Sequence, residues 1–74
     1  MLGEKIKILR RKSNMSRFVL SRRAVFEGFL NCSVYMLSQI EDGKLIPSKN
    51  QCIALARAMQ IPEWKILGRE EMAV

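Results

Sequence analysis

The sequence predicts a single all-α domain of five helices. Apolar residues recur at intervals of three and four along most of the chain, which is the spacing of one helix face. Short clusters of Ser, Asn, Asp, Gly and Pro separate these segments and supply helix caps and turns. With 74 residues, the chain has room for one domain.

The first helix is predicted over residues 2 to 12. Leu2, Ile6 and Leu9 share one stripe, so the segment is amphipathic. The basic side chains of this segment fall mostly elsewhere: Lys5, Lys7, Arg11 and Lys12. Asn14 tolerates a left-handed conformation and is expected to end the helix.

The second helix is expected to begin after Ser16, a good N-cap. Arg17 then stands in the first turn, where a cation opposes the helix dipole, so we expect it to serve something other than helix stability. Leu20 is a predicted core residue. Gly28 is expected to end this helix, which is a lengthened one.

The third helix lies within L-N-C-S-V-Y-M-L-S-Q-I-E-D-G-K-L-I-P, residues 30 to 47. Ser33 is the expected N-cap, and the pair Asp42-Gly43 ends the helix. Val34, Leu37 and Ile40 recur every three residues and are the predicted buried positions. The side chains between them are uncharged and able to form hydrogen bonds, and such a face suits contact with base edges: Tyr35, Met36, Ser38 and Gln39.

Two further helices are predicted. Ser48 caps the fourth, which shows helical recurrence of apolar residues at Ile53, Leu55, Ala56 and Met59. The fifth starts within residues 61 to 64, with Pro62 early in its first turn, and returns Ile66 and Leu67 to the core. Residues 1 to 68 form the predicted domain, and residues 69 to 74 a frayed polar tail.

The charge of the chain indicates an anionic partner. There are 13 basic and 7 acidic residues, a net charge of +6. Eight basic residues and no acidic residue lie between Lys5 and Phe26. The longest uncharged run, Gly28 to Ile40, has 13 residues, against about 20 needed to span a bilayer. We therefore expect neither a membrane span nor a secretion signal.

The residues of metal sites and of catalysis are scarce. Cys32 and Cys52 stand in predicted helices, and the chain has no histidine and no C-x-x-C pair. We expect both cysteines to be small buried hydrophobes in a reducing cytosol. With no nucleophile elbow, phosphate-binding glycine loop or clustered carboxylates either, we expect no metal, no cofactor and no enzymatic activity.

The segment from residue 30 to 47 resembles the Cro and phage-repressor type (XRE-like) helix-turn-helix regulators. Their pattern L-G-V-S-x-x-x-I-S-x-I-E-x-G-K-x-x-P has the same spacing as this segment, and the resemblance extends over about residues 2 to 68. It implies a lambda-repressor-like fold and a transcriptional regulator, expected to be a repressor, that binds double-stranded DNA as a homodimer. A bacterial or phage-encoded cytoplasmic protein, nucleoid-associated when bound, is expected.

The resemblance also implies roles for individual residues. The third helix would read the major groove, and its base-contacting residues would be Val34, Tyr35, Met36, Ser38 and Gln39. Phosphate contacts would come from Arg17, Arg22, Arg23, Ser33, Lys44, Lys49 and Asn50. Arg10 and Glu41 would form a structural ion pair.

An insertion is the most distinctive feature of the chain. The family places 16 residues between the serines of helices two and three, whereas Ser16 and Ser38 are 22 apart, so about six residues are added, most simply within residues 24 to 29. This segment supplies either extra core or an exposed aromatic patch, around Phe18, Phe26 and Phe29, that binds another protein or a second copy. A different register would bury Glu27 without a partner, and is disfavoured.

A second function stays open from the sequence. The apolar residues on the third helix and in the insertion favour a protein-interaction module on the same fold, such as an anti-repressor or an antitoxin component, with weak or nonspecific DNA binding. The dimer surface is expected either in the fifth helix, including Trp64, or in the insertion. Trp64 as a core residue is the other interpretation.

Overall fold

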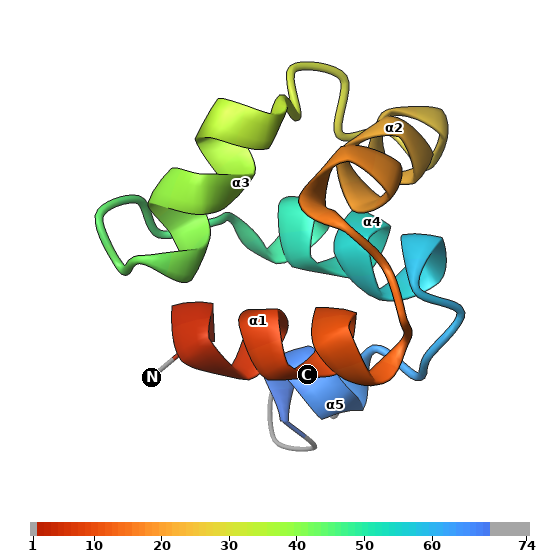
Figure 1. Ribbon diagram of the computed structural model, residues 1–74. Helices are drawn as coiled ribbons and strands as arrows, with labels where there is room; N and C mark the ends of the chain where they lie inside the picture. Colours follow the sequence, from red (N-terminus) through yellow and green to blue (C-terminus); the bar gives the residue numbers. More distant parts are fainter. Residues whose placement is uncertain (1, 69–74) are drawn as a thin grey trace.

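The computed structural model describes residues 2 to 68, and every regular element in that part of the chain is a helix (Figure 1). The helices are α1 (Leu2–Lys12), α2 (Arg17–Phe26), α3 (Val34–Glu41), α4 (Lys49–Ala58) and α5 (Trp64–Leu67). The predicted all-α class and the number of helices are confirmed for these residues. The expected tail, residues 69 to 74, lies outside the described residues.

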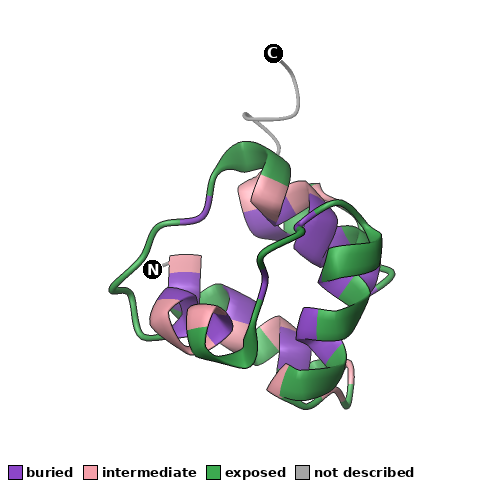
Figure 2. Ribbon diagram, turned by 90° about the horizontal axis from the view of Figure 1, so that it is seen from above, coloured by how far each residue is buried: buried purple, intermediate pink, exposed green. Residues whose placement is uncertain are grey.

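The helices surround one apolar core. α4 packs against α2 and α5, while α3 packs against α1 and α2. Figure 1 shows α2 and α3 above α1, and α4 at a level between α1 below and α2 and α3 above. Each helix contributes buried residues, and buried segments are coloured purple in Figure 2. The largest fully buried side chains are Ile6, Leu20, Leu37, Ile40, Cys52, Leu55 and Ile66.

Local capping fixes where three of the helices begin. Each predicted serine cap accepts a hydrogen bond from the backbone amide three residues on: Ser16 from Val19 at 3.1 Å, and Ser33 from Met36 at 3.0 Å. Ser48 does the same and forms a full capping box with Gln51. These bonds satisfy amides that have no partner within the helix.

Left-handed residues occur where α1 and α2 end. Asn14 has φ 56°, as predicted for the residue that closes α1. Gly28 has φ 109° and follows Glu27, the C-cap of α2, so the predicted end of the second helix at Gly28 is confirmed. A residue with a Cβ is strained at a φ of 109°, which explains why glycine stands at position 28.

Three local predictions are wrong. Cys32 precedes α3 instead of lying in a helix, because Ser33 starts that helix. Pro62 precedes α5, which is a single turn beginning at Trp64. Val34, a predicted buried position, is exposed in the first turn of α3.

Glu27 is exposed, as the preferred register of the insertion expects. The register that would bury Glu27 is therefore excluded.

Gly3 marks a close approach between α1 and the end of α3. A Cβ at this position would collide with the carbonyl oxygen of Ile40 and lie 2.9 Å from that of Glu41. Both contacts are with backbone, so the helices would have to separate.

We expect Gly3→Ala to destabilise the protein by about 1 to 3 kcal/mol, although alanine raises helix propensity by about 1 kcal/mol. Thermal unfolding measures the change, with Glu4→Ala, an exposed neighbour, as the control. A melting temperature above that of the native protein would show that helix propensity outweighs the collision.

Candidate nucleic-acid interface

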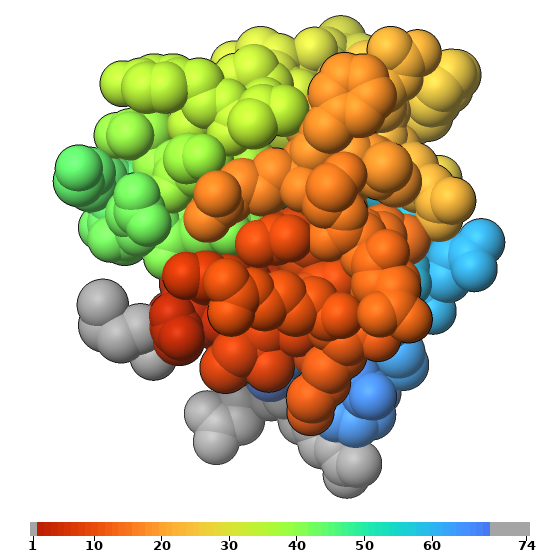
Figure 3. Space-filling view, viewed as in Figure 1, coloured from red at the N-terminus to blue at the C-terminus, as the bar shows by residue number. Residues whose placement is uncertain are grey.

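α3 is anchored along one side and exposed along the other. Leu37 and Ile40 are buried in the core, and Glu41 is buried at the last turn. At the first turn, Tyr35 leaves 74% of its surface exposed. In Figure 3, the atoms of α3 and α2 lie side by side over the upper part of the face shown, so both helices are accessible from the same direction.

The five predicted base-contacting residues differ in accessibility. Val34 and Tyr35 are exposed, whereas Met36, Ser38 and Gln39 are half-buried, and Met36 packs against the core. The accessible face of α3 is therefore concentrated in its first turn. The five side chains carry no charge, so contacts there would rely on hydrogen bonds and apolar surface.

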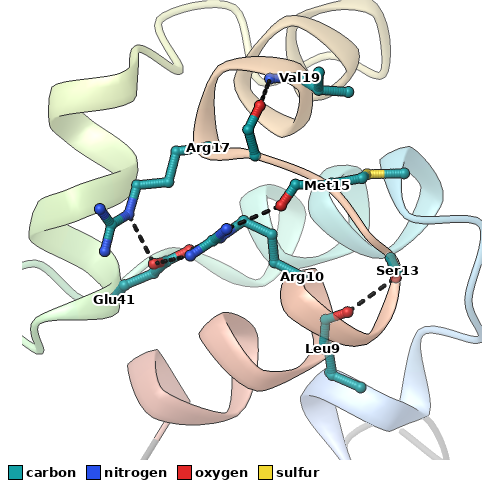
Figure 4. A network of polar contacts seen from close by, with 8 residues as sticks. Leu9, Arg10, Ser13, Met15, Arg17, Val19 and Glu41 are labelled. Carbon is teal, nitrogen blue, oxygen red and sulfur yellow. Dashed lines mark hydrogen bonds and ion pairs between the residues drawn. The ribbon is translucent and has the colours of Figure 1, made fainter.

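Arg10, Arg17 and Glu41 form a polar network between three helices (Figure 4). The predicted ion pair is present: Arg10 Nε lies 2.7 Å from Glu41 Oε2, and Arg10 Nη2 donates to Oε1 at 3.1 Å. Arg10 Nη1 also donates to the carbonyl of Met15 at 2.9 Å. Arg17 Nε donates to Glu41 Oε1 at 2.9 Å. One buried carboxylate thus holds two guanidinium groups.

The network fixes the end of α3 relative to α1 and to the first turn of α2. It also gives Arg17 a contact that the sequence analysis missed, because 24 residues separate Arg17 from Glu41. Only Nε of Arg17 takes part in the contacts within residues 2 to 68, and the side chain keeps 35% of its surface exposed. Its two terminal nitrogens are the groups that can meet a phosphate.

Four of the other predicted phosphate-contacting residues lie on α2, at either end of α3, or at the start of α4. Arg22 is exposed on α2, Ser33 caps α3, and Lys44 follows α3, with its backbone amide donating to the carbonyl of Gln39 at 2.9 Å. Lys49 is exposed at the start of α4.

Arg23 and Asn50 line hollows along α4 instead. Arg23 shares a cavity of about 200 Å³ with Arg57 and Gln60. Asn50 faces residues 27 to 29 across a groove of about 350 Å³.

The insertion provides both core and exposed surface. Ala24 and Phe29 are buried, so the interpretation that placed Phe29 in an exposed aromatic patch is wrong. The backbone amide of Phe29 donates a 2.9 Å hydrogen bond to the carbonyl of Ala24, which holds Phe29 against α2. Phe18 and Phe26 are exposed. Leu30, to which the sequence analysis assigned no role, is also exposed. It lies in an irregular segment, so helical periodicity could not predict its exposure.

Cys32 and Cys52 are both buried, as expected, and no disulfide joins them. Burial raises the pKa of the Cys32 thiol from its ordinary value of 9.0 to about 11. The thiol therefore stays protonated near neutral pH, and only the thiolate is a strong nucleophile or metal ligand. Within the described residues, no three His, Cys, Asp or Glu side chains gather as a metal site would need.

Comparison with known proteins adds no relative. The chain matches no protein-family model, no curated protein and no solved structure. Among residues 2 to 68, none of the helices has the length and apolar character required to cross a bilayer.

Proposed function

We propose that this protein binds double-stranded DNA through α3 and acts as a sequence-specific transcriptional regulator, most simply a repressor. The observation that carries the proposal is the Glu41 network, which holds the partly exposed Arg17 beside a helix whose outward residues are uncharged. This combination supplies a phosphate contact next to side chains able to meet base edges. The net charge of +6 further supports an anionic partner.

In this proposal, positioning and reading are separate tasks. Arg17, Arg22 and Lys44 contact phosphates and orient the domain, while α3 lies in the major groove. Gln39 can pair with an adenine edge, Tyr35 can form a hydrogen bond, and Val34 can contact a thymine methyl. A two-fold dimer would place two α3 helices on half-sites about 34 Å apart.

The test is selection from a pool of random duplexes by the purified protein at two salt concentrations. The proposal expects enrichment of a two-fold symmetric site, with weaker binding at the higher salt concentration. Retention of duplexes without enrichment would reduce the proposal to nonspecific DNA binding, and the absence of retention at both concentrations would refute it.

We expect Gln39→Ala to weaken binding to the selected site by about 1 to 3 kcal/mol, since a bidentate contact to one base would be lost. The loss should fall on one or two base positions, measured by repeating the selection with the variant. Asp42→Ala, an exposed neighbour beyond the helix, is the control. Equal weakening on selected and random duplexes would remove Gln39 from sequence readout.

A protein-interaction role is the second candidate, and the exposure of Phe26 and Leu30 favours it. DNA binding and apolar protein contact differ in their response to salt. Counterion release makes DNA affinity fall steeply with added salt, whereas apolar contacts are not screened. A salt titration on the natural target therefore distinguishes the two.

A further inference from the structure

α2 is apolar on its outward face as well as on the face that it buries. Leu20 and Ala24 point into the core. On the opposite side, Phe18, Arg22 and Phe26 follow at intervals of four, which places them on one stripe. Val19 and Val25 are exposed as well. Grouped exposed apolar side chains mark interaction sites on protein surfaces, so this face of α2 has the composition of a contact surface.

The exposed apolar area is large for so small a domain. Phe26 keeps 87% of its surface exposed, Leu30 78% and Phe18 58%. The two phenylalanine rings alone leave on the order of 300 Å² in contact with water, which already reaches the size of the largest apolar patch on a typical monomer. We use the name α2 patch for Arg22 and the exposed apolar residues of α2, together with the exposed Leu30 that follows four positions after Phe26: Phe18, Val19, Arg22, Val25, Phe26 and Leu30.

Arginines give the α2 patch a definite charge. Arg22 lies within it, with its guanidinium carbon 5.6 Å from the centre of the Phe18 ring. Beside Phe26 opens the cavity of about 200 Å³ that Arg23 and Arg57 line. Arg57 Nε lies 3.4 Å from Glu63 Oε2, and the Arg57 side chain is largely exposed, so its guanidinium can donate to a second carboxylate. Glu27 is the one acidic side chain that lines this cavity.

We infer that the α2 patch docks an acidic amphipathic segment of another protein. Apolar side chains of the partner cover Phe18, Phe26 and Leu30, and a carboxylate enters the cavity between Arg23 and Arg57. The inference does not depend on the proposed DNA binding. Because Arg22 belongs to both surfaces, a partner bound here would compete with DNA for that residue.

Other occupants fit this surface less well. A second copy would bring the same arginine against Arg22, at a net charge of +6 on each chain. Nucleic-acid bases can stack on the two rings, but the aliphatic side chains of Val19, Val25 and Leu30 offer them neither a stacking plane nor a hydrogen bond. Aliphatic and aromatic side chains of a protein use all of this surface.

The experiment measures binding of a fluorescein-labelled synthetic helical peptide by fluorescence anisotropy. The peptide carries leucines at helical spacing along one face and glutamates along both flanks. Two peptides serve as controls: one with the same composition in scrambled order, and one with lysine in place of every glutamate. We expect the acidic amphipathic peptide to bind and both control peptides to fail.

Variants then locate the contact. Phe26→Ser and Leu30→Ser should each weaken peptide binding by about tenfold, whereas Ile46→Ser, which alters an equally exposed apolar residue on the loop after α3, should leave it within about twofold. Arg23→Ala should weaken binding, while Arg11→Ala, an exposed arginine of α1, should not. Circular dichroism checks that each variant is folded.

Several results would overturn the inference. Equal binding of the scrambled or the lysine peptide would show nonspecific adhesion, and failure of the acidic peptide to bind would remove the proposed chemistry. If Phe26→Ser converted a dimer to a monomer in sedimentation, the occupant would be a second copy. If Phe26→Ser instead abolished binding to duplex DNA or to vesicles of anionic lipid while peptide binding persisted, the α2 patch would be a contact surface for DNA or for lipid.

Discussion

Glu41→Ala is expected to destabilise the fold by about 3 to 5 kcal/mol, because it leaves the buried guanidinium of Arg10 without its counter-charge. Glu41 accepts hydrogen bonds from Arg10 at 2.7 Å and 3.1 Å and from Arg17 at 2.9 Å. For a domain of this size, each kcal/mol lowers the melting temperature by about 4 to 8 °C. Thermal and urea unfolding measure the loss.

Arg17→Ala is the matched comparison, since it removes the other partner of the same carboxylate. Arg17 is partly exposed, so its bond to Glu41 is weakened by water, and the loss should be about 1 kcal/mol. Arg10→Ala should approach the effect of Glu41→Ala, because it leaves a buried carboxylate with one partner. An unchanged melting temperature for Glu41→Ala would refute the structural role of the network.

The affinity for DNA is expected to fall by about 150-fold between about 50 and 200 mM salt for each protomer, if about four phosphates are neutralised. The cations that the proposal assigns to this task are Arg17, Arg22 and Lys44. The fourth is Lys49, which the sequence predicts to contact a phosphate and which is exposed at the start of α4. Their release of counterions gives a slope of about −3.6 in a plot of log affinity against log salt. Anisotropy of a labelled duplex over a series of salt concentrations measures it.

Arg17→Ala should reduce this slope by about 1 and weaken binding to all duplexes alike, as expected for a phosphate contact. Arg11→Ala serves as the control, because Arg11 lies on α1 and has no assigned contact with DNA; its slope should match that of the native protein. A salt dependence that is flat for all three proteins would contradict DNA binding through these residues.

The two phenylalanines of the insertion illustrate the limit of prediction from this sequence. Phe26 and Phe29 are three residues apart and chemically identical, yet one is exposed and the other buried. Gly28 turns the chain between them with a φ of 109°, and the amide of Phe29 returns to the carbonyl of Ala24. Helical periodicity does not extend through such a turn, so the sequence left open whether the insertion adds core or an exposed patch. In the structure, Phe29 belongs to the core and Phe26 to the exposed surface.

The sequence by itself determined where α2, α3 and α4 begin and what ends α1 and α2. Ser16, Ser33 and Ser48 cap their helices through bonds that reach only three residues along the chain, and Asn14 and Gly28 adopt left-handed angles that their own chemistry permits. Such signals act within a few residues, so they can be read without knowledge of the fold. The Arg10 and Glu41 pair was available only through the family resemblance.

The tertiary structure alone decided which charged side chains lie together. It directs Arg17 to Glu41 and Arg23 to the cavity beside Arg57, although both arginines belong to α2. They stand six positions apart on the helix, which turns their side chains to different flanks. The neighbour on each flank comes from a distant part of the chain. The packing of α3 and α4 around α2 sets those neighbours, and no local pattern in the sequence encodes it.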